Sequence, residues 1–147
     1  MANSTSIHGR RLQLGNDANE LLSNGVQITS KAVDAVITVG AEASNVRTVD
    51  IQLNDSNGQA IDYVESFEIW MFSSAAGTAL SSGGSTGLAI GTDGLLQALV
   101  AKLIFVATTE NDGHWDGTWT DTGTAAACVG VKLPGGRMVY STAFANT

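Results

Sequence analysis

The chain has 147 residues, enough for one domain with a buried core, and hydrophobic residues make up 44% of it. Charged residues account for only 14%, against roughly 25% in an average soluble domain, so Ser, Thr, Asn and Gly must carry the surface. The formal net charge of −7, with only seven Lys and Arg, argues against a nucleic-acid-binding domain, because neutralising phosphates requires a basic face.

The first 31 residues are polar and weakly patterned, and we interpret them as an extended N-terminal arm. A turn signal stands at Gly15-Asn16-Asp17, and a brief helix around Asn19 to Leu22 is considered. Four leucines are expected to anchor the arm on the parent domain or on a neighbouring subunit, and they are Leu12, Leu14, Leu21 and Leu22. The candidate interaction residues of the arm are Arg10, Arg11, Leu12 and Leu14. The start of the chain lacks the basic-then-apolar layout of a signal peptide, and no apolar run approaches the ~20 residues of a membrane span. We therefore expect a protein made in the cytoplasm, with no membrane partner.

From residue 33 the hydrophobic period changes to two, which predicts strands. Apolar residues alternate with polar ones over 33–39 and again over 49–53, and the cluster Asn54 to Gly58 predicts a turn. The segment Ser66 to Ser73 is apolar on both faces, with Phe67, Ile69 and Met71 on one face and Trp70 and Phe72 on the other. Such a strand either lies centrally in a sheet or meets a partner, so Trp70 and Phe72 are candidate interaction residues.

The middle of the chain contains a flexible loop and one ambiguous stretch. Nine of the eleven residues in 77–87 are Gly, Ser or Thr, which indicates a surface loop. No Gly-Lys-Ser/Thr ending follows it, so a phosphate-binding loop is not favoured. The leucines of 95–106 also fit helical spacing, but the flanking residues favour two short strands with a turn near Lys102.

The last third of the chain continues the two-residue period. Asn111-Asp112-Gly113 predicts the turn of a hairpin, with Trp115, Gly117 and Trp119 on one face of the next strand. After a turn at 121–123, alternate residues from Ala125 to Leu133 share a face. A turn at 134–137 then precedes a last strand from Met138 to Phe144. About eight strands at 8–12-residue spacing predict an all-β fold, an antiparallel jelly-roll-like or immunoglobulin-like sandwich over residues 32–147.

No catalytic arrangement emerges from the residue inventory. Cys128 is the only cysteine and lies in a predicted core strand, so we interpret it as a small buried hydrophobe. His8 falls in the arm and His114 at the expected hairpin tip, and we interpret both as exposed and without a partner that would fix a tautomer. One cysteine and two separated histidines do not suffice for a zinc site.

The carboxylates raise two further alternatives. Asp116 and Asp121 flank Trp119 as a glycosidase pair could, but one lies on a strand's polar face and the other in a turn. The run Glu110 to Asp116 faintly resembles a calcium loop, but it lacks the Asp-x-Asp-x-Asp-Gly order and the distal Glu. We therefore expect no enzyme, no cofactor and no metal, and we expect function to lie in surfaces.

From Val49 onward the chain resembles a small structural β-domain of tailed-phage virions. The resemblance extends over about two-thirds of the chain, and the stretches that carry it are 49–58, 67–73, 112–123 and 133–139. The resemblance implies a sandwich on the virion, of the kind found in head decoration proteins and in tail or fibre components, with no catalytic residues to transfer.

Two functions follow as expectations. The first is a decoration, or cement, protein that binds the major capsid protein on the outer capsid surface as a homo-trimer or homo-dimer. The second is a receptor- or carbohydrate-binding module of a tail or fibre, with Trp115 and Trp119 as an exposed platform. The spacing of these tryptophans favours the first, because it places them more simply in the core.

Overall fold

The structure, a computed structural model, describes residues 32–147 in full and, before them, only the backbone of four short strands. These strands pair antiparallel in the order β1-β2-β3-β4, and their bounds are Ser4–Ile7, Arg10–Leu14, Leu21–Ser23 and Val26–Gln27. The helix considered around Asn19 to Leu22 is wrong over its second half, because Leu21 and Leu22 belong to β3 and pair with β2. Asn19 lies outside the described residues.

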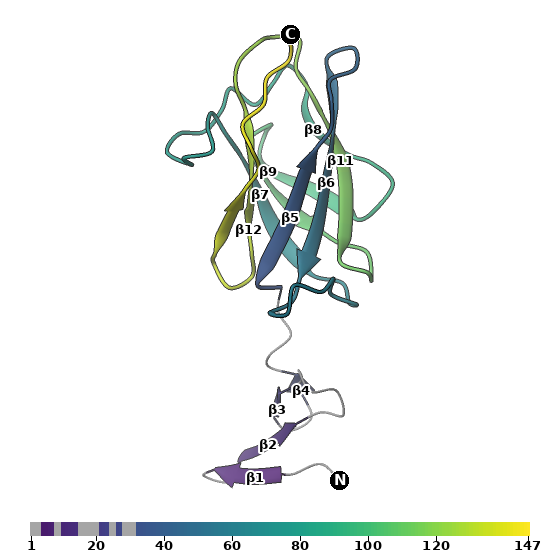
Figure 1. The fold of residues 1–147 in the computed structure, drawn as a ribbon, viewed down its shortest axis with the longest axis vertical. Helices are drawn as coiled ribbons and strands as arrows, with labels where there is room; N and C mark the ends of the chain where they lie inside the picture. Colours follow the sequence, from purple (N-terminus) through teal and green to yellow (C-terminus); the bar gives the residue numbers. More distant parts are fainter. Residues whose placement is uncertain (1–3, 8–9, 15–20, 24–25, 28–31) are drawn as a thin grey trace. The chain divides into compact units, whose positions relative to one another are not determined.

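Contacts divide the chain into two compact units, Met1–Lys31 and Ala32–Thr147. The second unit is an all-β sandwich of two antiparallel sheets, as the two-residue period predicted (Figure 1). One sheet has the order β5-β6-β11-β8, with strands Asp34–Val39, Val46–Asn54, His114–Thr120 and Gly87–Ile90. The other has the order β13-β12-β7-β10-β9, with strands Met138–Tyr140, Cys128–Lys132, Ser66–Phe72, Ile104–Thr108 and Leu95–Val100. No helix among the described residues is long and apolar enough to cross a membrane.

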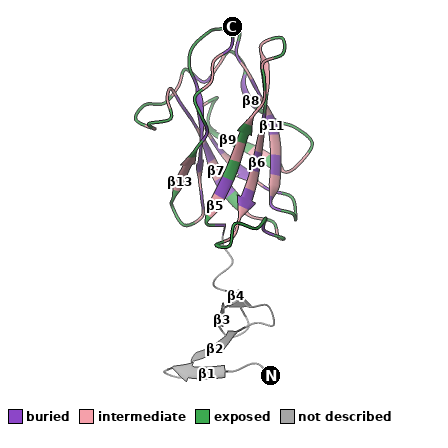
Figure 2. Cartoon of the chain, viewed as in Figure 1, coloured by how far each residue is buried: buried purple, intermediate pink, exposed green. Residues whose placement is uncertain are grey.

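The core lies between the two sheets, and the alternating residues of both supply it (Figure 2). Val49, Ile51 and Leu53 of β6 are fully buried, and Trp115 and Trp119 of the adjacent strand β11 are buried on the same side of that sheet. Each such aliphatic side chain contributes about 1.5–3 kcal/mol of transfer free energy on burial. The opposite sheet adds the inward residues Phe67, Ile69 and Met71 of β7, together with Val129 and Val131 of β12. Cys128 is also fully buried, which confirms its interpretation as a core residue.

The turn at 111–113 forms as predicted, but it does not make a hairpin. Gly113 adopts a positive φ of 73°, and the backbone N–H of Glu110 donates to the carbonyl of His114. However, β10 pairs with β7 and β9, whereas β11 pairs with β6 and β8. The chain therefore passes from one sheet to the other at this turn, a choice that local turn chemistry cannot reveal.

The ambiguous stretch resolves into two strands with a turn at Lys102, as predicted. Lys102 has a φ of 65°, and β9 and β10 pair antiparallel on either side of it. The register shifts between Ile104 and Phe105, so that β10 skips Leu99. The loop predicted at 77–87 is present up to residue 86, but strand β8 begins at Gly87 and was missed.

The last strand is shorter than predicted and ends at Tyr140. The hydroxyl of Ser141 accepts from the backbone N–H of Val129, which interrupts the regular ladder, and a single bridge between Ala127 and Phe144 restores the pairing. Ala125, expected on the buried face, is exposed because β12 begins only at Cys128. Arg47 then holds the C-terminus by donating to Asn146 Oδ1 at 2.9 Å and to the Ala145 carbonyl at 2.6 Å.

Candidate functional site

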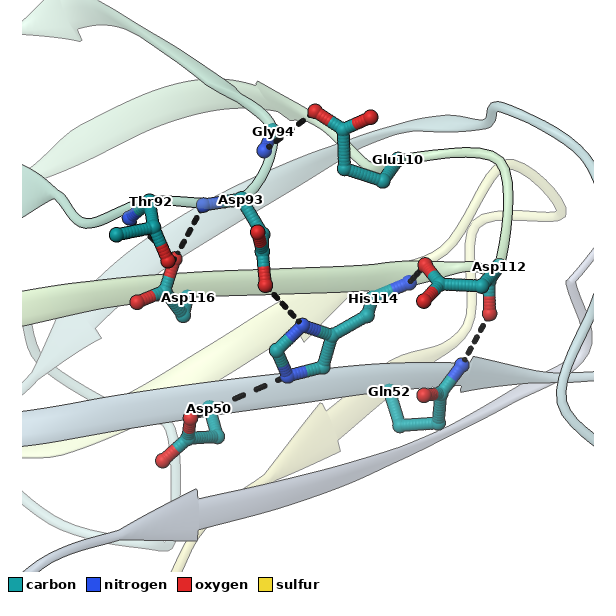
Figure 3. Close-up of polar contacts among 9 residues, drawn as sticks. All are labelled: Asp50, Gln52, Thr92, Asp93, Gly94, Glu110, Asp112, His114 and Asp116. Carbon is teal, nitrogen blue, oxygen red and sulfur yellow. Dashed lines mark hydrogen bonds and ion pairs between the residues drawn. The ribbon is translucent and has the colours of Figure 1, made fainter.

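Several titratable side chains gather around His114 in a polar cluster (Figure 3). His114 starts β11, Asp50 comes from the neighbouring β6, and Asp93 comes from the loop between β8 and β9. His114 Nδ1 lies 3.1 Å from Asp93 Oδ2, and Nε2 lies 3.9 Å from Asp50 Oδ1. Since an ionised carboxylate can only accept, Nδ1 donates to Asp93. The expectation of an exposed, unpartnered histidine is therefore wrong for His114, because tertiary folding brings two carboxylates to it, whereas His8 lies outside the described residues.

The acids next to this histidine are occupied by backbone N–H groups. Asp116 Oδ1 accepts from the N–H groups of Thr92 at 2.7 Å and Asp93 at 2.6 Å. Glu110 accepts from the N–H of Gly94 and Asp112 from that of His114. The bonds to Asp116 and Glu110 fix the loop between β8 and β9 against β11 and the turn before it, so the cluster acts as a structural latch (Figure 3).

The latch presents no arrangement that we can assign to a reaction. A histidine–carboxylate pair serves catalysis when the second ring nitrogen faces a nucleophile or a substrate, and here Nε2 faces another carboxylate, Asp50. Within residues 32–147 no group of three or more His, Cys, Asp or Glu is placed to hold a metal ion. Asp121, the other member of the carboxylate pair that the sequence suggests with Asp116, is buried and accepts from the N–H of Gly123 in its own turn.

The tryptophans considered as an exposed platform are both in the core. Trp115 is 0% exposed and Trp119 is 1% exposed. Trp115 Nε1 donates to the carbonyl of Leu95, and Trp119 packs edge-on against Phe144 with ring centroids 5.1 Å apart. The version of a carbohydrate-binding module that depended on these two rings is therefore wrong.

A different aromatic surface lies on the outer face of the five-stranded sheet. Trp70 and Phe72 stack there with ring centroids 6.2 Å apart, as neighbours two residues apart on β7. Tyr140 of β13 packs edge-on against Phe72 at 5.6 Å. The pairing of β7 with β12 and of β12 with β13 brings these rings together. We call Trp70, Phe72 and Tyr140 the aromatic face.

Glu68 and Lys132 fix the orientation of the Trp70 ring. Lys132 Nζ donates to Glu68 Oε1 at 3.0 Å, and Trp70 Nε1 donates to Glu68 Oε2 at 2.8 Å. The ammonium also lies 6.0 Å from the centre of the Trp70 ring, a cation–π contact. The bonds from Lys132 and then Trp70 hold the pKa of the Glu68 carboxyl below its usual range. These contacts together fix the position of the Trp70 ring.

Two shallow hollows border the aromatic face. The larger has a volume of about 350 Å³ and is lined by Trp70, Phe72, Gly77, Lys132, Gly136, Met138 and Tyr140. The second, of about 280 Å³, shares Lys132 and Gly136 with it and extends toward Pro134 and Ser66. Trp70 is partly exposed and Tyr140 is 38% exposed, whereas Phe72 is 7% exposed and packs against both. Such an outer sheet surface, with exposed rings beside an ion pair, suits contact with a partner.

The candidate interaction residues of the sequence divide into two groups. Trp70 and Phe72 lie together on the outer sheet face, at the positions that the alternation predicted. Arg10, Arg11, Leu12 and Leu14 belong to β2, and their side chains lie outside the described residues. Tyr140 and Lys132 were missed, because only the pairing of three strands distant in sequence brings them to Trp70.

No protein-family model and no curated protein matches this chain. Among solved structures, a β-glucuronidase from Parabacteroides merdae aligns at 14% identity and a TM-score of 0.46, over 93% of this chain and 16% of that one. The chain thus spans about a sixth of that enzyme's length. A cohesin module from a family 33 glycoside hydrolase of Clostridium perfringens aligns at 8% identity and a TM-score of 0.43, over 80% of this chain and 95% of that one. Neither likeness bears on what this chain does.

Proposed function

We propose that the chain is a decoration, or cement, protein of a tailed-phage capsid. It binds the major capsid protein on the outer capsid surface through the aromatic face and stabilises the head by bridging capsomers. The observation that carries the proposal is the aromatic face, in which the buried Phe72 ring supports the more exposed rings of Trp70 and Tyr140, bordered by two shallow hollows. The virion context comes from the resemblance of the sequence from Val49 onward.

Rigid aromatic anchors suit a protein that must bind an assembled lattice. Aromatic side chains carry much of the energy of protein interfaces, and a ring fixed in advance loses little entropy on binding. The bonds from Trp70 and Lys132 to Glu68 provide that fixation. Many copies that act on one shell reinforce each other, so each contact needs only modest affinity.

The charge of the chain agrees with a place on the outside of a capsid. The net charge of −7 keeps closely spaced copies soluble and repels nucleic acid. The N-terminal segment, residues 1–31, supplies a second contact in this proposal, in which Arg10 and Arg11 face acidic groups of a neighbouring capsomer. Surface ion pairs of this type are worth about 0–1 kcal/mol each, so the segment mainly adds reach.

The test is addition of purified protein to expanded capsids that lack it, measured by co-sedimentation and by the temperature at which the capsids rupture. Wild-type protein is expected to co-sediment and raise that temperature. Trp70→Ala and Tyr140→Ala are expected to weaken addition by about tenfold or more, as loss of an interface anchor does. Val36→Ala is the matched control, because Val36 is 56% exposed on the other sheet and lies outside the aromatic face.

Three outcomes would contradict parts of the proposal. If wild-type protein fails to add to capsids, the cement function is wrong. If both aromatic variants add normally, the aromatic face is not the contact. If a chain without residues 1–31 adds normally, the N-terminal segment is not a second contact.

The alternative, a receptor- or carbohydrate-binding module of a tail or fibre, now depends on the aromatic face as well. Trp70 with Glu68 and Lys132 offers a ring beside hydrogen-bonding groups, which is what a sugar ring requires. Glycan-array binding that is lost in Trp70→Ala, together with failure to add to capsids, would favour this alternative over the cement function.

A further inference from the structure

The four sheet edges of the sandwich are not equally protected. A strand at an edge presents unpaired backbone groups, and proteins normally blunt such edges with short strands or with charges. β13 has three residues and β8 has four. β5 starts with Asp34, and the Arg137 guanidinium pairs with that carboxylate and donates to the carbonyl of Val33.

β9 is the exception among these edges. It has six residues, Leu95-Leu-Gln-Ala-Leu-Val100, with no charge and no proline. Leu95 is 70% exposed, Leu99 is 60% exposed and Val100 is 46% exposed. Gln97 and Ala98 are exposed as well, so both faces of the strand's second half are open to solvent. The bulge at Leu99 protects only the C-terminal end and leaves Leu95 to Ala98 regular.

We propose that β9 pairs antiparallel with β9 of a second copy of this chain, forming a twofold dimer with a continuous sheet of ten strands. The sequence of the strand complements itself. A twofold axis through Gln97 sets Leu95 opposite Leu99, Leu96 opposite Ala98 and Gln97 opposite Gln97 of the second copy, so that each pair shares one face of the sheet. No like charges meet, and two of the three kinds of pair are wholly apolar, the type that stabilises adjacent strands.

Charges at the two ends of β9 favour this same orientation. Asp93 lies two residues before the strand and Lys102 two residues after it. In an antiparallel pair the start of one strand meets the end of the other, so each Asp93 lies at the same end as the partner copy's Lys102. The Asp93 side chain is 46% exposed, although its Oδ2 accepts from His114, and Lys102 is exposed, with its ammonium donating to the carbonyl of Ser85. A parallel arrangement would instead bring like charges together.

This dimer is an isologous interface, closed at two copies, and it leaves the aromatic face of each copy free for another partner. The dimer forms from purified protein alone and does not require the capsid. In the proposed function it supplies the bridge, since two linked copies can hold two capsomers at once.

The experiment is sedimentation velocity on the full chain from about 1 to about 100 µM, a range that covers weak to moderate interfaces. The wild type is expected to pass from monomer to dimer. Leu99→Lys is expected to raise the dimer dissociation constant by about tenfold or more. Val36→Lys is the matched control, because Val36 is 56% exposed on edge strand β5, and it is expected to leave the dimer intact. Circular dichroism checks that both variants fold.

Two further readouts separate this pairing from any other association. Lys102→Glu should weaken the dimer at low salt, and the loss should shrink as salt screens the new repulsion from Asp93. Amide hydrogen exchange over 95–100 should slow as protein concentration rises. A wild type that stays monomeric would overturn the inference, as would a trimer, a dimer insensitive to Leu99→Lys, or one lost in Val36→Lys.

Discussion

Trp115 and Trp119 allow the contribution of a buried hydrogen bond to stability to be measured by comparison. Both rings come from the same face of β11 and are 0% and 1% exposed. Trp115 Nε1 donates to the carbonyl of Leu95 at 3.1 Å. Trp119 Nε1 is the one buried side-chain polar atom within the described residues that has no hydrogen-bond partner. Replacing each by phenylalanine removes similar volume from a similar environment, so the difference between the two variants isolates the polar contribution.

The magnitude follows from the cost of each N–H group. Trp115→Phe loses a hydrogen bond with a net worth of about 1 kcal/mol, whereas Trp119→Phe removes a buried donor whose unsatisfied burial costs about 1–3 kcal/mol. Trp115→Phe should therefore lower the free energy of unfolding by about 2–4 kcal/mol more than Trp119→Phe.

Urea unfolding followed by tryptophan fluorescence is the appropriate assay. All three tryptophans lie within residues 32–147, so the signal reports on the sandwich alone. Equal denaturant slopes in the two variants would show that the comparison concerns stability and not compactness. Equal losses of stability, or a larger loss in Trp119→Phe, would refute the reasoning.

Three more predictions concern the sandwich. The Lys132 ammonium and the Trp70 indole lower the pKa of Glu68. The stabilisation by the ionised carboxylate is therefore full above about pH 4.3, the usual glutamate value, and is lost as pH falls through the lowered pKa. Glu68→Gln should melt at a lower temperature than wild type at neutral pH and converge with it in acid. Asp116→Ala removes the acceptor of two backbone N–H groups in the loop between β8 and β9, so amide exchange in that loop should accelerate while exchange in β7 stays unchanged. Gly58 and Gly113 have similar positive φ angles, but a methyl group at Gly113 would lie 2.4 Å from Ile61, whereas one at Gly58 would meet nothing within 4 Å. In denaturant unfolding, Gly58→Ala should lower the free energy of unfolding by about 1 kcal/mol. Gly113→Ala should lower it by clearly more.

The sequence determined the parts of this protein that depend on local alternation and turn chemistry. A two-residue period predicts strands whatever their partners, so β5, β6, β7, β11 and β12 were expected near their actual positions. The same period assigned Val49, Ile51 and Leu53 to the core and set Trp70 and Phe72 on the face opposite Phe67. The positive φ that a tight turn requires explains why Gly58 and Gly113 marked their turns correctly, whereas the turn at Lys102 was inferred from the residues that flank it.

Tertiary structure alone decided which strands pair and which side chains from distant strands meet. A turn at 111–113 is the same locally whether the chain stays in one sheet or crosses to the other, so the crossing was not predictable. His114 looked unpartnered because Asp50 and Asp93, which reach it through β6 and the loop before β9, lie far away in sequence. Tyr140 meets Phe72 through the pairing of β7, β12 and β13. The exposure of β9 likewise follows from its position at the edge of a sheet. Alternation in the sequence predicts the face on which each side chain lies, but only the arrangement of neighbouring strands decides whether that face is covered.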